Sequence, residues 1–435
     1  MKKNILKSAV LVLLLVGFTS CLSELDQEPL DPDTITAKEV YKDAKSAKSA
    51  LAKVYGALAL TGQGTGGGAD IAGNDEGATG FSRILFCLQE LPTDEAKNCW
   101  GDGDLNDYNF MTWTATGGFN EATYNRIGIG ISIANDFIEN ATKHLGENPE
   151  VKQFIAEARF IRAYLYSIGM DLYGKMPIVT EVGKDPKPKQ ATRKEVFAFV
   201  EKELKEIEGI LSATPKEYGR VNKYAATALL SRIYLNAEVY TGTPKWSEAK
   251  AKAEEVINSG EYRLHTIYPE LFMADNNTNG AQNEFIFVLS QTGNNSNYSG
   301  TTFLVHAAGG DDMNMATFGV NGGWYGNITT GSFVDLFTEG NDTRKMFHTK
   351  DKSEERTKNI VKQNGKISFG GNGYLITKWT NLTSTKVLKT GGDNILVNPG
   401  VYNITIDTEN NTYTLERSKE PAVEPTTGTA NSWGI

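Results

Sequence analysis

The stretch AEARFIRAYLYSIGMDLYGKMP, residues 156–177, decides how this chain folds. Apolar residues recur through it and just before it at spacings of three and four, which predicts a single amphipathic helix: Val151, Ile155, Ala158, Leu165, Ile168 and Leu172. Gly174 closes the run, because glycine can take the left-handed conformation of a helix cap. Pro177 then prevents the helix from continuing.

Other runs along the chain have the same helical spacing. Taken in chain order they form three consecutive pairs, 39–60 with 121–144, 151–173 with 192–211, and 221–239 with 246–259. The last pair resembles a tetratricopeptide repeat. Because stacked pairs bury a continuous core that a single pair cannot bury, we expect a mostly α-helical fold of tetratricopeptide-type pairs with long functional loops and a few short strands.

The first twenty residues read as a signal peptide. A lysine-rich start precedes an apolar run at 9–18, and small residues lead into Cys21, as at a bacterial lipoprotein cleavage site. Lipidation of Cys21 would anchor the chain in a membrane through acyl groups. The alternative is an ordinary secretory signal with an incidental cysteine.

Composition excludes some functions. The net charge of −9 argues against nucleic acid, which rewards basic surfaces, and favours a neutral ligand. The four histidines are scattered and show no metal-binding spacing with cysteine. Cys87 and Cys99 could form a disulfide in an oxidising compartment, but buried unpaired cysteine is common, so both states stay open.

The sequence motif A-E-A-R-F-x-R-A, followed by D-L-Y-G-x-x-P, resembles that of the SusD/RagB family of outer-membrane glycan-binding lipoproteins. The resemblance covers roughly residues 21–379 and is strongest towards the starch-binding members. It implies a SusD-like glycan-binding domain at 21–380 and a surface-exposed location on the outer membrane. Acidic residues just after Cys21 resemble the surface-export signal of such lipoproteins.

The resemblance also implies a site. In starch-binding members two tryptophans and a tyrosine form a curved aromatic surface that follows the bend of an α-glucan, and an arginine beside them hydrogen-bonds sugar hydroxyls. The residues that match by position are Trp100, Tyr298, Trp324 and Arg83. Asn98, which stands where those members carry a further tryptophan, is a weaker candidate.

The chemistry of these residues fits the assignment. The C–H face of a glucose ring stacks on an aromatic face, and arginine presents a planar fork of donors to neighbouring hydroxyls. Tryptophan more often packs in a core. Here each aromatic lies in a Gly/Asn-rich segment without a helical period, including the irregular segment 71–116, which favours a binding role.

Calcium is a second implied ligand. Asp275 matches an aspartate that helps to hold calcium in starch-binding members, but their partner carboxylates come from a C-terminal segment that has no counterpart here. Because calcium needs several oxygens, a plain turn is the alternative role of Asp275.

The resemblance ends near residue 380. Residues 398–415 alternate as a β-hairpin with a turn at 408–411, which resembles the end of a SusE-like module, so 381–435 form an atypical tail. In the family a last helix pair follows, and the residues after 380 contain no similar run. We therefore expect the third pair to expose the apolar face that such a pair would cover.

These observations predict a non-enzymatic, cell-surface binder of starch-type α-glucan or maltooligosaccharide that serves a SusC-like TonB-dependent transporter. Two alternatives remain. Glu90, Asp94 and Glu95 could supply the paired carboxylates of a glycoside hydrolase. The helices could also be an interaction scaffold without a glycan ligand.

Overall fold

The computed structural model describes residues 36–62, 71, 77–101, 104–214, 217–290, 302–310, 322–340 and 342–347, and the backbone of strands at 366–369, 385–390, 402–407 and 412–417. The expected signal peptide, the lipidation site at Cys21 and the expected glycan contact at Tyr298 lie outside these ranges. In the described part of the chain, no helix is both long and apolar enough to cross a bilayer.

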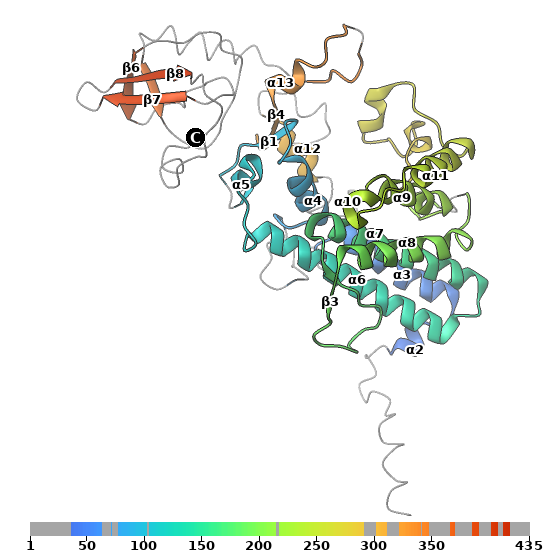
Figure 1. The fold of residues 1–435 in the computed structure, drawn as a ribbon. Coiled ribbons are helices and arrows are strands. Elements are labelled where there is room, and N and C mark those ends of the chain that lie inside the picture. The colour runs from blue at the N-terminus through green and yellow to red at the C-terminus, as the bar shows by residue number, and fades with distance from the viewer. Residues whose placement is uncertain are drawn as a thin grey trace, which may run out of the picture.

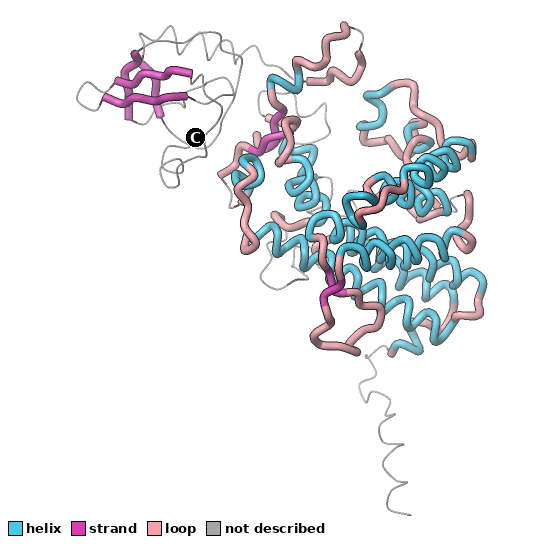
Figure 2. Tube along the Cα trace, viewed as in Figure 1, coloured by secondary structure: helices cyan, strands magenta, loops and turns pink. Residues whose placement is uncertain are grey.

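Helices dominate the described residues (Figures 1 and 2). The body of the molecule consists of α2 (Ala37–Val40), α3 (Ala44–Ala59), α6 (Gly118–Leu145), α7 (Pro149–Tyr173), α8 (Arg193–Glu208), α9 (Lys223–Leu235), α10 (Ala237–Thr241) and α11 (Trp246–Asn258).

The expected pairing of helices is confirmed. Helix α3 contacts α6, α7 contacts α8, and α9 contacts α11, while contacts of α6 with α7 and of α8 with α9 join the pairs into one stack. Two boundaries were wrong. The run at 39–60 is divided at Asp43, whose side chain accepts the Ser46 amide and so starts a new helix. The run at 221–239 is divided into α9 and α10 at Asn236.

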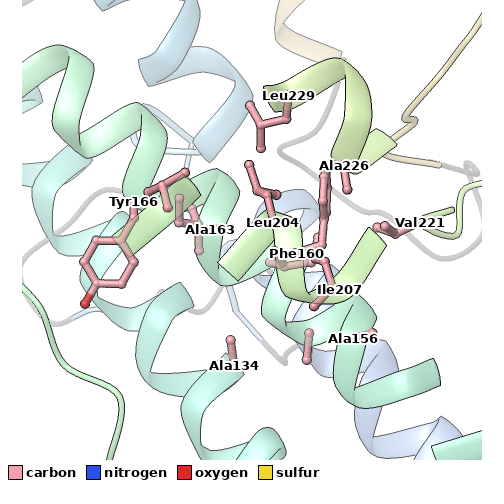
Figure 3. Close-up of a cluster of buried hydrophobic side chains, with 14 of the residues drawn as sticks. Ala134, Ala156, Phe160, Ala163, Tyr166, Leu204, Ile207, Val221, Ala226 and Leu229 are labelled. Carbon is pink, nitrogen blue, oxygen red and sulfur yellow. The ribbon is translucent and has the colours of Figure 1, made fainter. Parts of the chain in front are cut away.

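The core of the stack is made where α6, α7, α8 and α9 meet. Figure 3 shows Phe160 and Ala163 of α7 among Leu204, Ile207 and Leu229 of its neighbours. Small residues let the helices approach closely: a Cβ atom on Gly130 of α6 would lie 2.7 Å from Leu165 of α7. Helix α7 ends as expected at Gly174, which has a φ of 75°.

The charged residues of the opening stretch are part of this scaffold. Glu157 is buried, and its carboxylate accepts hydrogen bonds from Tyr55 of α3 and from Arg220. Arg159 and Arg162 both donate to Glu203 of α8. The motif that suggested the family therefore holds three neighbouring elements together through buried ion pairs.

A second group of elements lies beside the stack and carries the loops (Figure 1). It comprises α4 (Phe81–Glu90), β1 (Ala96–Asn98), α5 (Leu105–Phe110), α12 (Thr302–Ala308), β4 (Asn327–Thr329) and α13 (Gly331–Val334). Strand β1 pairs antiparallel with β4. The expectation that 71–116 is irregular was wrong, because α4 buries Phe81, Ile84 and Cys87 along one helical face.

Short elements complete the described chain: β2 (Met176–Pro177) paired with β3 (Gln190–Ala191), and the 3₁₀ turns η1 (Tyr268–Phe272) and η2 (Ala281–Asn283). A separate four-stranded sheet has the order β5 (Lys366–Phe369), β6 (Thr385–Thr390), β8 (Thr412–Arg417), β7 (Tyr402–Asp407). Strands β7 and β8 are antiparallel neighbours, which confirms the expected C-terminal hairpin. Its likeness to a SusE-like module stays a prediction.

Candidate functional site

Arg83 lies on α4 at the centre of the candidate site. Its guanidinium carbon is 5.2 Å from the centroid of the Trp100 ring and 5.0 Å from that of the Phe303 ring. Its Nη1 donates to the carbonyl of Gly77 at 3.1 Å. The two cation–π contacts hold the guanidinium against the Trp100 and Phe303 rings.

Trp100 follows β1 and is held in one orientation. Its indole Nε1 donates to the carbonyl oxygen of Trp324 at 2.9 Å, and the two indole rings are 6.2 Å apart with a 46° tilt. The ring rests against the backbone of Gly326, where a Cβ atom would come within 2.4 Å of it. Two residues 224 positions apart in the sequence thus form one aromatic surface.

The loop that carries Trp324 is attached to the end of α12. The amides of Trp324, Tyr325 and Gly326 donate to the carbonyls of His306, Gly309 and Ala307 respectively, at 2.7, 2.9 and 2.8 Å. Close backbone contact requires glycine here, because a Cβ atom on Gly323 would lie 2.3 Å from the backbone of Gly309. The loop is therefore preorganised rather than free to adapt.

His306 supports Trp324 from behind. The imidazole and indole rings stack with centroids 4.7 Å apart and an interplanar angle of 21°. The ring nitrogen Nδ1 lies 2.7 Å from the Gly322 carbonyl, which fits a neutral or charged imidazole that donates from Nδ1. Sequence analysis missed His306, because a lone histidine on a short helix has no pattern that points to a tryptophan further along the chain.

A small core of its own lies under this surface. It contains Ile84, Cys87, Leu91, Leu105, Tyr108, Phe119, Phe303 and Ala307, with Trp100 packed against it. Cys87 and Cys99 are not joined by a disulfide. Burial raises the pKa of the Cys87 thiol to about 12, although the nearby Arg83 opposes this rise, so Cys87 acts as a small apolar side chain.

Asn98 was expected to contact the glycan, but it lies buried in the protein. Its side chain is buried, with 3% of the residue exposed. The amide nitrogen Nδ2 donates to Asn327, the oxygen Oδ1 accepts the backbone amide of Trp100, and the backbone of Asn98 forms two hydrogen bonds with the Asn109 side chain. Asn98 is thus a positioning residue for Trp100, because its polar groups are already engaged within the protein.

We call Trp100, Trp324 and Tyr325 the aromatic platform. Trp324 is 44% exposed and Tyr325 is exposed to a similar degree, while Arg83 contacts the Trp100 ring and His306 stacks on the Trp324 ring. Tyr325 was not expected; its φ of 50° turns its ring over Gly310. Of the four main candidates, the structure brings Arg83, Trp100 and Trp324 together, and Tyr298 lies outside the described residues.

Asp275 has the surroundings of a turn residue. Its carbonyl accepts the amides of Thr278 and Asn279, and its Oδ1 accepts from the Asn279 side chain at 3.2 Å. Within the described ranges, no three His, Cys, Asp or Glu side chains gather in a way that could hold a metal ion. Since calcium takes six to eight oxygens, the described residues around Asp275 do not by themselves form a calcium site, and calcium binding there stays a prediction.

The three acidic residues considered for hydrolysis, Glu90, Asp94 and Glu95, lie between the end of α4 and the start of β1. The backbone carbonyls of Asp94 and Glu95 accept hydrogen bonds from the hydroxyls of Thr330 and Thr329, and the Glu90 carbonyl accepts from Thr93. These contacts attach the β1 side of the site to β4. They give the segment a structural role that needs no paired carboxylates.

Comparison with known proteins agrees with this architecture. A SusD-like family model described as "Starch-binding associating with outer membrane" matches residues 82–235, which include α4, β1 and the opening stretch. Starch-binding protein SusD of Bacteroides thetaiotaomicron is 35% identical over 341 residues. The chain is therefore similar in sequence to SusD-like proteins. Both descriptions name binding and not catalysis, in agreement with the expectation of a non-enzymatic protein.

The alignment with SusD covers 77% of this chain and 59% of the relative, so the chain spans about three fifths of the relative's length. Solved SusD-like structures share the fold. A SusD homologue from Bacteroides thetaiotaomicron matches with a TM-score of 0.56 at 21% identity, covering 69% of this chain and 57% of that one. Surface glycan-binding protein A from Bacteroides fluxus matches with a TM-score of 0.55 at 20% identity, covering 69% and 63%.

Proposed function

We propose that this SusD-like protein binds starch-type α-glucan or maltooligosaccharide at the aromatic platform. The observation that carries the proposal is the junction of Trp100 and Trp324, whose indole rings are tilted against each other and whose contact is fixed by a hydrogen bond from the Trp100 indole to the Trp324 backbone carbonyl. Each ring can stack on the C–H face of one glucosyl unit. The 46° tilt suits a curved chain, since consecutive units of an α-glucan also turn relative to each other.

Preorganisation supports the same role. The loop that carries Trp324 is hydrogen-bonded to α12, His306 stacks on the Trp324 ring, and Arg83 contacts the Trp100 ring. A ligand therefore meets side chains that lose little rotamer freedom on binding. Arg83 and the undescribed Tyr298 are assigned to sugar contacts, Arg83 as a hydrogen-bond donor and Tyr298 as a further aromatic surface.

The proposed cellular role rests on the similarity to SusD-like proteins. We propose that Cys21 is lipidated and anchors the protein at the outer surface of the outer membrane. We also propose that the protein delivers oligosaccharide to a SusC-like TonB-dependent transporter. Support comes from the family description, which names association with the outer membrane, and from the lipoprotein pattern before Cys21. Residues 21–380 would form the glycan-binding domain and 381–435 the atypical tail.

Binding and hydrolysis are separated by one experiment. The purified protein is incubated with amylose, and both its affinity and the release of reducing ends are measured. We expect saturable binding without reducing ends, and a loss of about tenfold or more in Trp324→Ala, because removing a central aromatic contact usually costs more than 1 kcal/mol.

Trp246→Ala is the matched control, since Trp246 is exposed on α11 in the helical stack. Equal affinity of Trp246→Ala and the unmodified protein assigns the loss to the platform. Release of reducing ends would support the hydrolase alternative and contradict the proposal. Failure of the unmodified protein to bind amylose would favour a scaffold without a glycan ligand.

A further inference from the structure

A second exposed aromatic surface lies at the tip between α5 and α6. Trp113 is 48% exposed, and one face of its ring stacks on Tyr108 with centroids 6.2 Å apart and an angle of 27°. Tyr108 itself is only 2% exposed and donates from its hydroxyl to Asn120. One face of the Trp113 ring is therefore packed on a buried tyrosine of the small core, while nearly half of the residue is exposed.

The backbone before Trp113 is held in an unfavourable conformation. Met111 has a φ of 56°, in the left-handed region that costs a residue with a side chain roughly 1–2 kcal/mol. Hydrogen bonds from the Met111 amide to Asp107 and Tyr108, and from Thr112 to Asp107, keep it there. Strain of this kind gathers at functional sites, where it orients a side chain.

The surroundings of Trp113 suit a sugar better than a protein. Thr112, Thr114 and Thr116 flank Trp113 in the sequence and are exposed; the Thr112 hydroxyl bonds to Asp107, and those of Thr114 and Thr116 bond to each other. The exposed apolar side chains of this tip are Phe110, Met111 and Trp113. A stable protein interface needs about 20–30 residues on each side, whereas a sugar ring needs one aromatic face and a few hydrogen-bonding groups.

The tip is coupled to the aromatic platform through α5. The Asn109 side chain forms two hydrogen bonds with the backbone of Asn98, and the Lys97 ammonium donates to the Asn109 carbonyl. Trp100 follows Asn98 by two residues, and Trp113 follows Asn109 by four. The chain path therefore keeps Trp100 and Trp113 within roughly 25–30 Å of each other, which a polymer can span.

We propose that Trp113 is a second glucan contact, which binds another part of an α-glucan polymer already held at the aromatic platform. This proposal rests on the proposed function. Two linked contacts raise the affinity for a long chain, because the second contact forms at a high effective concentration. We expect a closed ring of α-glucose, such as a cyclodextrin, to engage one surface at a time, because it cannot extend from one to the other as an open chain does.

The test compares amylose with a cyclodextrin. In Trp113→Ala we expect the affinity for amylose to fall by about tenfold, while the affinity for the cyclodextrin stays within about twofold, because only the polymer uses both contacts. Trp113→Phe, which keeps an aromatic face on Tyr108, should recover most of the affinity for amylose. Trp246→Ala serves again as the control for loss of an exposed tryptophan.

The outcomes separate this proposal from the proposed function. Unchanged affinity of Trp113→Ala for amylose overturns the second contact and leaves the platform standing, provided that Trp324→Ala loses binding. Equal loss for amylose and cyclodextrin, without recovery in Trp113→Phe, indicates a general disturbance of the small core and also overturns it. Unchanged amylose affinity together with loss of binding to a SusC-like transporter would make Trp113 a protein contact instead.

Discussion

At the scale of single residues, the candidate site depends on glycines that a sequence pattern cannot interpret. Gly326 permits the ring of Trp100 to lie on the backbone, and Gly323 permits that backbone to touch Gly309. These contacts join segments that are far apart in the chain. They explain the glycines in the described parts of the loop between α12 and β4, 309–310 and 322–326, where the positive φ belongs to Tyr325 and not to a glycine.

Substitution of Gly326 tests this account. In Gly326→Ala the new methyl group would lie 2.4 Å from the Trp100 ring, so the indole must move away from Trp324. We expect the affinity for amylose to fall by about tenfold or more and the free energy of unfolding to fall by about 1–3 kcal/mol. Titration with amylose and thermal unfolding measure the two effects.

Gly322→Ala is the control, because a Cβ atom there meets no atom within 4 Å. It should bind amylose like the unmodified protein. If Gly326→Ala and Gly322→Ala had equal affinities, the orientation of Trp100 would not matter for binding.

At the scale of elements, buried ion pairs fix how neighbouring helices align with each other. Glu203 of α8 accepts hydrogen bonds from Arg159 and Arg162 of α7, and Arg162 donates further to Asn135 of α6 at 2.8 Å. Burial raises the pKa of the Glu203 carboxyl, but the hydrogen bonds and charges of the two arginines outweigh it, so the pKa lies below its usual 4.5. The ionised carboxylate is thus part of the folded state.

Neutralising this carboxylate should destabilise the stack. In Glu203→Gln the largely buried Arg162 loses its counter-charge and Arg159 keeps only Glu206, and we expect the free energy of unfolding at pH 7 to fall by about 3 kcal/mol. Denaturant unfolding measures the change. Glu254→Gln removes an exposed helical pair with Lys250 and should cost less than about 0.5 kcal/mol.

The effect has a defined pH window. Because the folded pKa of Glu203 is lowered, its contribution is complete above the unfolded value of 4.5 and is lost as the pH falls through the folded pKa. The difference in stability between the unmodified protein and Glu203→Gln should therefore shrink below pH 4.5. A constant difference down to pH 2 would contradict the ionic role of Glu203.

At the scale of the whole molecule, the third helix pair exposes the apolar face expected from the sequence. Trp246 and Ile257, eleven positions apart, lie on the same stripe of α11 and are 59% and 72% exposed. Leu235 at the end of α9 and Val239 of α10 are also exposed. Exposed apolar surface of this kind promotes association.

We expect the purified protein to self-associate with rising concentration. The double variant Trp246→Glu, Ile257→Lys should shift the elution in size-exclusion chromatography towards the monomer, because it places charges on the stripe. Val182→Lys, which removes a single exposed apolar side chain from the loop between β2 and β3, should have no such effect. A stable monomer at all concentrations would show that this face does not drive association.

Much of the fold was determined by the sequence itself. Helical periods predicted the three pairs, and a local rule predicted the glycine at the end of α7. The start of α8 is equally local, since Thr192 and Glu195 form a capping box there. These features depend on residues within one or two turns of each other. Helix α4 was missed because its apolar face is short and is surrounded by segments rich in glycine and asparagine.

The candidate site was determined only in part. Local sequence wording, compared with a family, selected Arg83, Trp100 and Trp324, but their contact depends on bonds that close across more than two hundred residues. The same long-range packing buried Asn98, placed His306 behind Trp324 and fixed Trp113 on Tyr108. Sequence periods report which residues face a core. Only the tertiary structure decides which distant loops meet, because that choice depends on the packing and hydrogen bonding of the whole fold.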